Sequence, residues 1–361
     1  MTTTTLPTRL RSGIIGAGFI GGVHAQAVRA AGGRLTRIAD VTPESAIKAA
    51  GTLGAEAAAA SAEELIASDE VDVVHICTPN ATHAKLAILA IQHGKAVICE
   101  KPLATTATDA EDVARAARTA GVVNAVPFVY RFHPHVRETR ERIAAGDAGR
   151  IWLLHGSYLQ DWLSRSADTN WRVDPKIGGV SRAFGDIGVH WCDLMEFATS
   201  QRIVRLAART ATAFDQRSAT EDGAVVLFET DGGASGSVVV SQVSPGRKNR
   251  LWFSFDGTEA SYSFDQESPE LLWVGGRDEN RLLMRDPTVE HPGSRRLSRL
   301  PAGHPQGYQD AFGAFVADVY SAVRGEIPDG LPTFEDGLRA ARITEAVIAS
   351  STDSTWMEVP A

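Results

Sequence analysis

Hydrophobic residues in the first third of the chain fall into short apolar runs separated by longer segments with helical spacing. The clearest runs are 71–77 and 96–99, which are almost continuously apolar, as expected for parallel strands buried on both faces. Shorter strands are predicted at 34–40, 56–60 and 122–126. With the strand that precedes the first glycine cluster, six predicted strands alternate with helices. This pattern indicates an α/β fold with a doubly wound parallel sheet.

The pattern changes after residue 128. Between 203 and about 264 there are repeated short strands separated by glycine- and proline-containing turns, which is typical of an antiparallel meander. We therefore predict two domains, a dinucleotide-binding domain at 1–128 and a second α+β domain at 129–361 with a large open, mostly antiparallel sheet. The charged segment 274–299 is predicted to be rich in loops. One face of the open sheet needs a cover, and a partner subunit could supply it.

Composition narrows the functional classes. The 361 residues are 43% hydrophobic and 22% charged, which is typical of a soluble enzyme, and the net charge of −8 argues against nucleic-acid binding. There is no run of eighteen apolar residues, so we expect no membrane span. The three cysteines show no paired spacing, and the chain starts without an apolar leader segment. A cytoplasmic protein is expected.

A glycine motif after the first strand predicts the cofactor. Gly16, Gly18 and Gly21 have G-x-G-x-x-G spacing between a strand and a helix, and Phe19 and Ile20 belong to the same turn. In such a motif the pyrophosphate lies against the glycine backbone and the helix N-terminus.

Selectivity between the two nicotinamide cofactors is predicted from Asp40, which closes the second strand. Its carboxylate can accept hydrogen bonds from a ribose diol and would repel a 2′-phosphate. Residues 41–43 contain no arginine or lysine to bind one. NAD is therefore favoured over NADP.

Polar residues also follow two later strands. Thr78, Pro79 and Asn80, with His83 beyond them, follow the run 71–77, and Glu100 and Lys101 follow 96–99. Ligands of open α/β sheets bind at the carboxyl ends of the strands, so contacts with the nicotinamide side of the cofactor are expected there. A lysine in this place could stabilise negative charge on an alkoxide. The alternatives are a helix-capping asparagine and a solvated lysine.

A further group of candidate catalytic residues lies in a predicted helix at 186–199. Asp186 and His190 are four residues apart and share one helix face, where an imidazole could shuttle a hydroxyl proton. A capping aspartate and a buried histidine are the structural alternative. A second alternative is a metal site formed by these two residues and Asp193. Hydride transfer with a lysine needs no metal, so no metal ion is expected.

Taken in order, these motifs resemble the glucose–fructose oxidoreductase / inositol dehydrogenase / rhizopine-catabolism (Gfo/Idh/MocA) family. The matching segments are 16–18, 78–80, 100–102 and the Asp186-x-Gly188-x-His190 motif. The resemblance implies a Rossmann domain, an α/β domain whose sheet packs between subunits of a homodimer or homotetramer, and reversible oxidation of a sugar or cyclic polyol. It also implies that Lys101, Asp186 and His190 are the catalytic residues.

A narrower resemblance concerns segments 158–162, 170–172 and 303–308, which are similar to those of sugar dehydrogenases that oxidise the C3 hydroxyl of levoglucosan, an anhydro-glucose, with NAD. It implies that Gln160, Trp162, Arg172 and His304 contact the sugar, together with the catalytic trio. Trp171 and Arg172 are also assigned to the cofactor. Two other functions stay open: a glycosidase that oxidises C3 transiently and then eliminates the glycoside, and a non-catalytic dinucleotide or sugar sensor.

Overall fold

A computed structural model describes residues 9–217 and 219–360, so the threonine-rich start at 1–8 lies outside the described residues. The chain packs into two compact units: Met1–Val129 with Gln309–Leu338, and Tyr130–Tyr308 with Arg339–Ala361. The first division lies next to the predicted boundary at 128. The return of the chain to the first unit was not predicted, because residues 129–361 were assigned to one domain.

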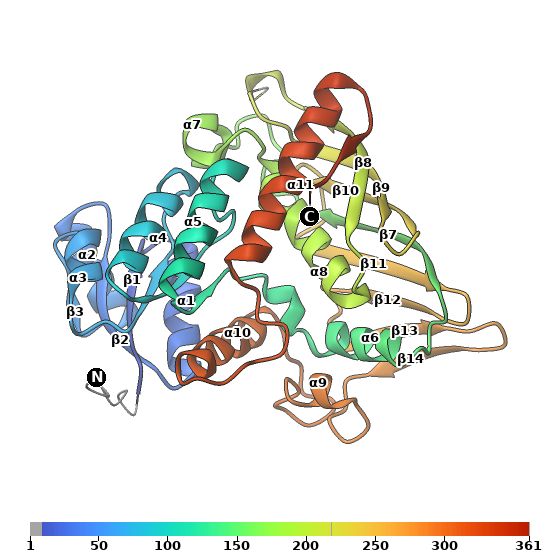
Figure 1. The fold of residues 1–361 in the computed structure, drawn as a ribbon, viewed down its shortest axis with the longest axis horizontal. Helices are drawn as coiled ribbons and strands as arrows, with labels where there is room; N and C mark the ends of the chain where they lie inside the picture. Colours follow the sequence, from blue (N-terminus) through green and yellow to red (C-terminus); the bar gives the residue numbers. More distant parts are fainter. Residues whose placement is uncertain (1–8, 218, 361) are drawn as a thin grey trace. The chain divides into compact units, whose positions relative to one another are not determined.

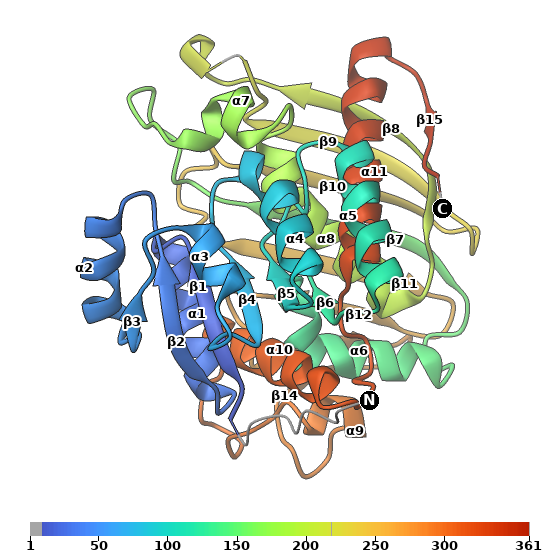
Figure 2. The ribbon, with the colours of Figure 1, turned by 60° about the vertical axis from the view of Figure 1, so that its left-hand side comes forward.

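The first unit contains a six-stranded parallel sheet in the order β3-β2-β1-β4-β5-β6, with helices on both faces (Figure 2). The predicted doubly wound fold is confirmed. The strand order reverses between β1 and β4, which is where such sheets bind dinucleotides. The strands are β1 (Arg11–Ile15), β2 (Arg34–Ala39), β3 (Ala57–Ala58), β4 (Val73–Ile76), β5 (Ala96–Cys99) and β6 (Asn124–Ala125). The helices are α1 (Phe19–Ala30), α2 (Pro43–Leu53), α3 (Ala62–Ala67), α4 (His83–Gln92), α5 (Ala107–Ala120), α10 (Tyr308–Val323) and the start of α11 (Phe334–Asp353).

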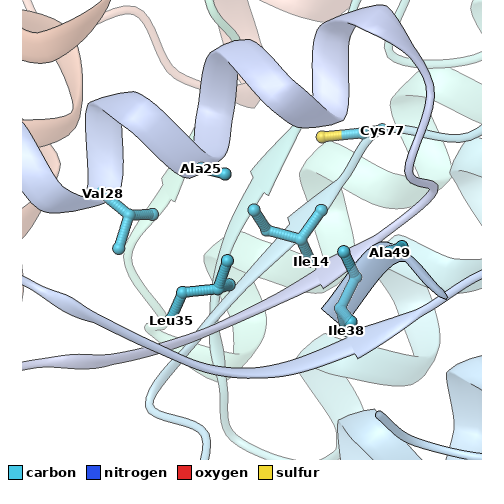
Figure 3. Close-up of a cluster of buried hydrophobic side chains, with 7 residues drawn as sticks. All are labelled: Ile14, Ala25, Val28, Leu35, Ile38, Ala49 and Cys77. Atoms are coloured by element: carbon cyan, nitrogen blue, oxygen red, sulfur yellow. The ribbon is translucent and has the colours of Figure 1, made fainter. Parts of the chain in front are cut away.

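A compact apolar cluster fixes α1 on the sheet (Figure 3). Ala25 and Val28, three residues apart on one face of α1, pack against Ile14 of β1 and against Leu35 and Ile38 of β2. All five side chains are buried. The glycine turn therefore joins a strand and a helix that are both held by the core, which makes it a rigid platform.

Helix α10 explains why the chain returns to the first unit. The Phe312 ring packs edge-on against His24 of α1, and Tyr320 Oη lies 2.6 Å from Ser12 Oγ of β1. Gln309 Nε2 donates to the Val23 carbonyl at 3.2 Å. Helical periodicity predicts the buried stripe of α10, but it does not say which sheet will bury that stripe.

The second unit is built on a nine-stranded sheet in the order β14-β13-β12-β11-β7-β10-β9-β8-β15, in which only β7 and β10 pair in parallel. The predicted open, mostly antiparallel sheet is confirmed. Helices α6 (Pro134–Ala144) and α8 (Val189–Thr199) lie on one face of it (Figure 1). Its strands are β7 (Ile151–Leu159), β8 (Ile203–Ala211), β9 (Gly223–Thr230), β10 (Ser235–Ser241), β11 (Arg250–Gly257), β12 (Ser261–Asp265), β13 (Leu271–Gly275), β14 (Asn280–Met284) and β15 (Met357–Glu358).

The segment 274–299, predicted to be rich in loops, lies mostly outside helices and strands. It also contains the end of β13, all of β14 and the short helix α9 (Pro292–Arg295), which the pattern does not predict. Strand β14 lies at the sheet edge with Leu282 and Met284 exposed, so it shows no alternation of buried and polar residues. Among the described residues, no helix is long and apolar enough to cross a membrane.

Candidate active site

The glycine turn of the first unit has the geometry of a pyrophosphate site. Gly16 has a φ of +97°, and a Cβ atom there would lie 2.6 Å from the Cys77 carbonyl oxygen. At Gly21 a Cβ atom would lie 2.1 Å from the Gly16 carbonyl oxygen, so both positions require glycine. A Cβ atom on Gly18 would meet nothing within 4 Å. The backbone at Gly18 therefore borders open space that a phosphate group can enter.

Helix α1 starts at this open position. Gly18 is its N-cap, makes no side-chain capping bond, and is followed by no acidic residue in the first turn. The N–H groups of the first turn are therefore available to an anion, which the helix dipole also favours. Phe19 and Ile20 occupy this first turn, as predicted. These features fit the pyrophosphate of NAD.

Asp40 follows β2 directly and lies beside the glycine turn. Its Oδ1 accepts a hydrogen bond from the Ala17 N–H at 3.4 Å, and its side chain is only partly buried. The second carboxylate oxygen can accept from a ribose hydroxyl. This is the placement that the sequence predicts for the residue that selects NAD.

The polar residues after β4 form a short 3-10 turn, Asn80–Thr82, before α4 begins at His83. The alternative role for Asn80, capping of α4, is not seen, because Asn80 itself starts the 3-10 turn and Thr82 is the N-cap of α4. Thr82 Oγ1 lies 2.6 Å from Thr78 Oγ1 and 2.8 Å from the Pro79 carbonyl oxygen, and its single hydrogen can be donated to either. Thr78 and Pro79 are partly exposed, which leaves them able to contact a cofactor.

His83 is fully buried, in contrast to these neighbours. Its Nδ1 lies 2.7 Å from the Pro102 carbonyl oxygen and its Nε2 lies 2.8 Å from the Thr78 carbonyl oxygen. Burial lowers the pKa of His83, although both carbonyls act in the opposite direction. A ring with no exposed surface has no face open to a cofactor. The structure therefore disagrees with the predicted contact between His83 and NAD, and the ring instead joins two loops.

Lys101 lies in the turn after β5, and the Lys101–Pro102 peptide bond is cis. The side chain of Glu100 folds back within the same turn: its Oε2 accepts from the Lys101 N–H at 3.1 Å, and its Oε1 lies 3.2 Å from His24 Nε2. Glu100 is buried whereas Lys101 is partly exposed. The carboxylate thus holds the turn from inside while the lysine side chain retains access to solvent.

The predicted catalytic residues of the second unit lie where a π-helical turn meets α8. Residues Phe184–Gly188 form the π turn that contains Asp186, and α8 starts at Val189, one residue before His190. The sequence predicts a single α-helix here. The Phe184 ring packs against Gly188 in this turn, where a Cβ atom would lie 2.5 Å from Phe184 Cδ2, so position 188 requires glycine. Such π turns are frequent at functional sites.

Asp186 is held by two donors. Gln242 Nε2 donates to Asp186 Oδ2 at 2.7 Å, and Arg172 Nε lies 3.4 Å from Oδ1. Gln242 is completely buried, and its Oε1 accepts from Arg182 Nη1 at 3.4 Å. Arg182 in turn forms a buried ion pair with Asp222. The arginine therefore fixes which end of the Gln242 amide faces Asp186, and both Gln242 and Arg172 direct N–H groups at the Asp186 carboxylate.

His190 lies against two tyrosine rings. The Tyr130 ring centroid is 5.2 Å from that of His190 in an edge-on arrangement, and the Tyr158 centroid is 6.3 Å away. The two phenol oxygens are 2.5 Å apart. Burial raises the pKa of Tyr130 to about 12 and raises that of Tyr158 well above its usual range. Both phenols stay protonated, and an imidazole, which ordinarily titrates near neutral pH, is the better base at this position.

A row of hydrogen bonds extends from these tyrosines to predicted sugar-contacting residues. Asn249 Oδ1 accepts from Tyr158 Oη and from Gln160 Nε2, each at 2.7 Å. Trp162 Nε1 donates to Gln160 Oε1 at 2.8 Å. The structure thus brings Gln160 and Trp162 together and adds Asn249, which the sequence analysis missed.

Arg172 and Trp171 form a second group near Asp186. The Arg172 guanidinium lies over the Trp171 ring, 4.3 Å from its centroid, and Asn170 Oδ1 accepts from the Arg172 N–H at 3.1 Å. His304 is exposed, and its imidazole makes no hydrogen bond or ion pair with any described residue. The structure therefore joins Arg172, but not His304, to the Asp186 cluster.

Asp193 has a structural partner. It is buried on α8 and forms a two-point ion pair with Arg131, whose Nε donates to Oδ2 at 2.8 Å. Among the described residues, no group of histidine, cysteine and acidic side chains could hold a metal ion. The carboxylate of Asp193 thus anchors α8.

Comparisons with known proteins agree with this arrangement. Residues 10–128 match the oxidoreductase family with an NAD-binding Rossmann fold, and residues 136–263 match the Gfo/Idh/MocA C-terminal domain. Levoglucosan dehydrogenase of Pseudarthrobacter phenanthrenivorans is 31% identical, over 97% of this chain and 98% of its own length.

Solved structures give the same result. Levoglucosan dehydrogenase in complex with NADH and levoglucosan superimposes with a TM-score of 0.91 at 30% identity, over 98% of this chain and 100% of that chain. An oxidoreductase domain protein from Kribbella flavida gives a TM-score of 0.91 at 33% identity over the same shares of the two chains. The chain therefore belongs to the Gfo/Idh/MocA family and is an NAD-binding oxidoreductase of sugars or polyols.

Proposed function

We propose that the protein is an NAD-dependent dehydrogenase that oxidises a secondary hydroxyl of a sugar or cyclic polyol to a ketone. The observation that carries this proposal is the pair in the second unit, where the Asp186 carboxylate, in contact with Gln242 and Arg172, stands one helical turn before His190. The two phenols beside the imidazole have raised pKa values and do not compete as bases.

In this mechanism the residues have separate tasks. His190 accepts the hydroxyl proton as a general base, and Asp186 orients the sugar and the imidazole. The Lys101 ammonium stabilises the negative charge that develops on the substrate oxygen. Bound NAD supplies the acceptor for the hydride that leaves the carbon, held by the turn at Gly16 and Gly18 and by Asp40. Thr78, Pro79, Asn80 and Glu100 line the nicotinamide side in this proposal.

For the substrate, we propose levoglucosan or a related anhydrosugar oxidised at C3. Support comes from the similarity to levoglucosan dehydrogenase and from the Asn249–Gln160–Trp162 row, which offers amide groups for sugar hydroxyls and an indole face for the C–H side. Arg172, stacked on Trp171, supplies a further donor.

A spectrophotometric screen at 340 nm tests both proposals. NAD is offered with levoglucosan, glucose, inositols, xylose and simple glycosides, and stoichiometric NADH formation with levoglucosan is expected. Cleavage of a glycoside without net NADH would identify the NAD-dependent glycosidase instead. Binding of NADH without turnover of any sugar would favour the sensor, and a response to NADP alone would overturn the choice of cofactor.

Replacing Asp40 by alanine is expected to relax the preference for NAD. The carboxylate would no longer accept from the ribose diol or repel a 2′-phosphate, and hydrogen bonds to charged groups are worth about 1.5–3 kcal/mol. The ratio of kcat/KM for NAD to that for NADP should therefore fall by about 10- to 100-fold. Asp69→Ala, at an exposed carboxylate of the same unit, serves as the control. An unchanged ratio in Asp40→Ala would contradict the assignment.

We also propose that a second copy of the chain covers the outer face of the nine-stranded sheet. This face carries exposed apolar side chains on several strands, including Val225 and Leu227 on β9, which are 49% and 52% exposed, and Val239 on β10. Monomeric proteins rarely expose apolar patches of this extent, and symmetric pairing buries the same patch twice.

Replacing Leu227 by lysine is expected to break this assembly, because each interface would then bury an unpaired ammonium group. Light scattering coupled to size exclusion should give the mass of a dimer or tetramer for the unmodified chain and a smaller mass for the variant. Ile327→Lys, at an exposed apolar residue of the first unit, should leave the mass unchanged. A monomeric unmodified chain would refute the proposal.

A further inference from the structure

Two buried histidines hold the turn that carries Lys101 from opposite ends. His24, on α1, places its Nε2 3.2 Å from Glu100 Oε1, and the other oxygen of that carboxylate accepts from the Lys101 N–H. His83, at the start of α4, places its Nδ1 2.7 Å from the Pro102 carbonyl oxygen. Neither imidazole is exposed, so neither can contact a substrate or cofactor.

The contacts of each ring assign different tasks to its two nitrogens. At His24, Nε2 faces Glu100 while Nδ1 faces His75 Nδ1 at 2.9 Å, away from the turn. At His83 the order is reversed: Nδ1 faces the turn at Pro102, and Nε2 faces the Thr78 carbonyl at 2.8 Å. A neutral imidazole has one N–H group, so it donates to one of its two partners at a time.

We propose that His24 and His83 form a clamp that fixes the backbone of residues 100–102 and thereby directs the Lys101 side chain toward the substrate oxygen. Both are positioning residues, and the inference rests on the role proposed for Lys101. The clamp matters because a misplacement of about 1 Å at a reacting group can cost about 100-fold in rate. It also links the Lys101 turn to α1, whose N-terminus faces the cofactor site.

Amide substitutions test the clamp, because an asparagine amide nitrogen approximates Nδ1 and a glutamine amide nitrogen approximates Nε2. At position 83, His83→Asn keeps the bond to Pro102 and should retain kcat within about 3-fold, whereas His83→Gln should lose about 10- to 100-fold. At position 24 the order should invert, with His24→Gln active and His24→Asn impaired. The same order at both positions, or equal losses for the two amides, would overturn the proposal.

A double-variant cycle separates positioning from general damage to the fold. If His83 acts through Lys101, His83→Gln should lower kcat strongly in the unmodified chain and hardly at all in a Lys101→Ala background. Equal losses in both backgrounds would show a merely structural role. Turnover by Lys101→Ala at the normal rate would instead overturn the role of the lysine itself, which distinguishes that failure from a failure of the clamp.

The variants must be compared as folded proteins. Thermal unfolding and NADH binding by fluorescence are recorded for each one, and kcat is measured well below the lowest unfolding midpoint. His135→Asn is a matched control, since His135 is buried in the other unit and its Nε2, which an asparagine amide does not replace, lies 2.9 Å from the Glu270 carbonyl oxygen. This control should lower the unfolding midpoint. Any effect that it has on kcat should be the same in the unmodified chain and in the Lys101→Ala background.

Discussion

Replacing His190 by alanine is expected to lower kcat by about 10²- to 10⁴-fold, the usual range for loss of a general base, while NADH still binds. The base must be neutral to accept a proton, so kcat/KM of the unmodified enzyme should rise with pH as the imidazole loses its proton. In the variant this rise should disappear. The measurements are pH profiles of kcat/KM and NADH titrations at one temperature.

Other groups around His190 are poor substitutes for it. Tyr130 has a pKa of about 12, and burial lowers the pKa of His133, which stacks on Tyr130, to about 4. Neither can act as an efficient base at neutral pH. His93→Ala, at an exposed histidine of the first unit, should show the unmodified profile. Near-normal turnover by His190→Ala would mean that the proton leaves by another route.

The sequence predicts the parts of the molecule that depend on local pattern. The six parallel strands, the glycine turn at Gly16 and Gly18 and the place of Asp40 follow from residue type and spacing along the chain. The packing of α10 on α1 does not, because amphipathic periodicity marks a face without naming its partner. The π turn at Asp186 is not predicted either, because helical periodicity does not distinguish a π turn from an α-helical one.

Residues that hold the proposed catalytic and sugar-binding side chains in place are the hardest to predict. Gln242 directly follows β10 and Asn249 directly precedes β11, at the two ends of a mostly polar connection. In the sequence they look like ordinary surface positions. What distinguishes Gln242 is complete burial between Asp186 and Arg182, a property of tertiary structure. His83 shows the opposite case, because its place after a strand end suggests contact with a ligand although its ring is buried.

Replacing Gln242 by glutamate is expected to disable the site at neutral pH. The substitution places a second carboxylate where an amide nitrogen now lies 2.7 Å from Asp186 Oδ2. Two carboxylates so close share a proton, which raises the apparent pKa of the pair. The proposed reaction needs Asp186 ionised, so activity should be lost as pH falls through this raised value. The acid limb of kcat/KM should therefore move to higher pH. At a fixed pH below the apparent pKa, kcat/KM falls about 10-fold for each rise of about one in that apparent pKa.

Two further variants separate charge from packing in this prediction. Gln201→Glu adds the same charge to the same unit, at a partly exposed glutamine whose Oε1 accepts from Thr230 Oγ1 at 2.5 Å, and should leave the acid limb in place. Gln242→Leu removes the donor without adding charge, so its limb should move less than that of Gln242→Glu. If Gln242→Glu kept the unmodified pH profile, Asp186 would not act as a carboxylate in the reaction. Its hydrogen bond to Gln242 would then serve the fold alone.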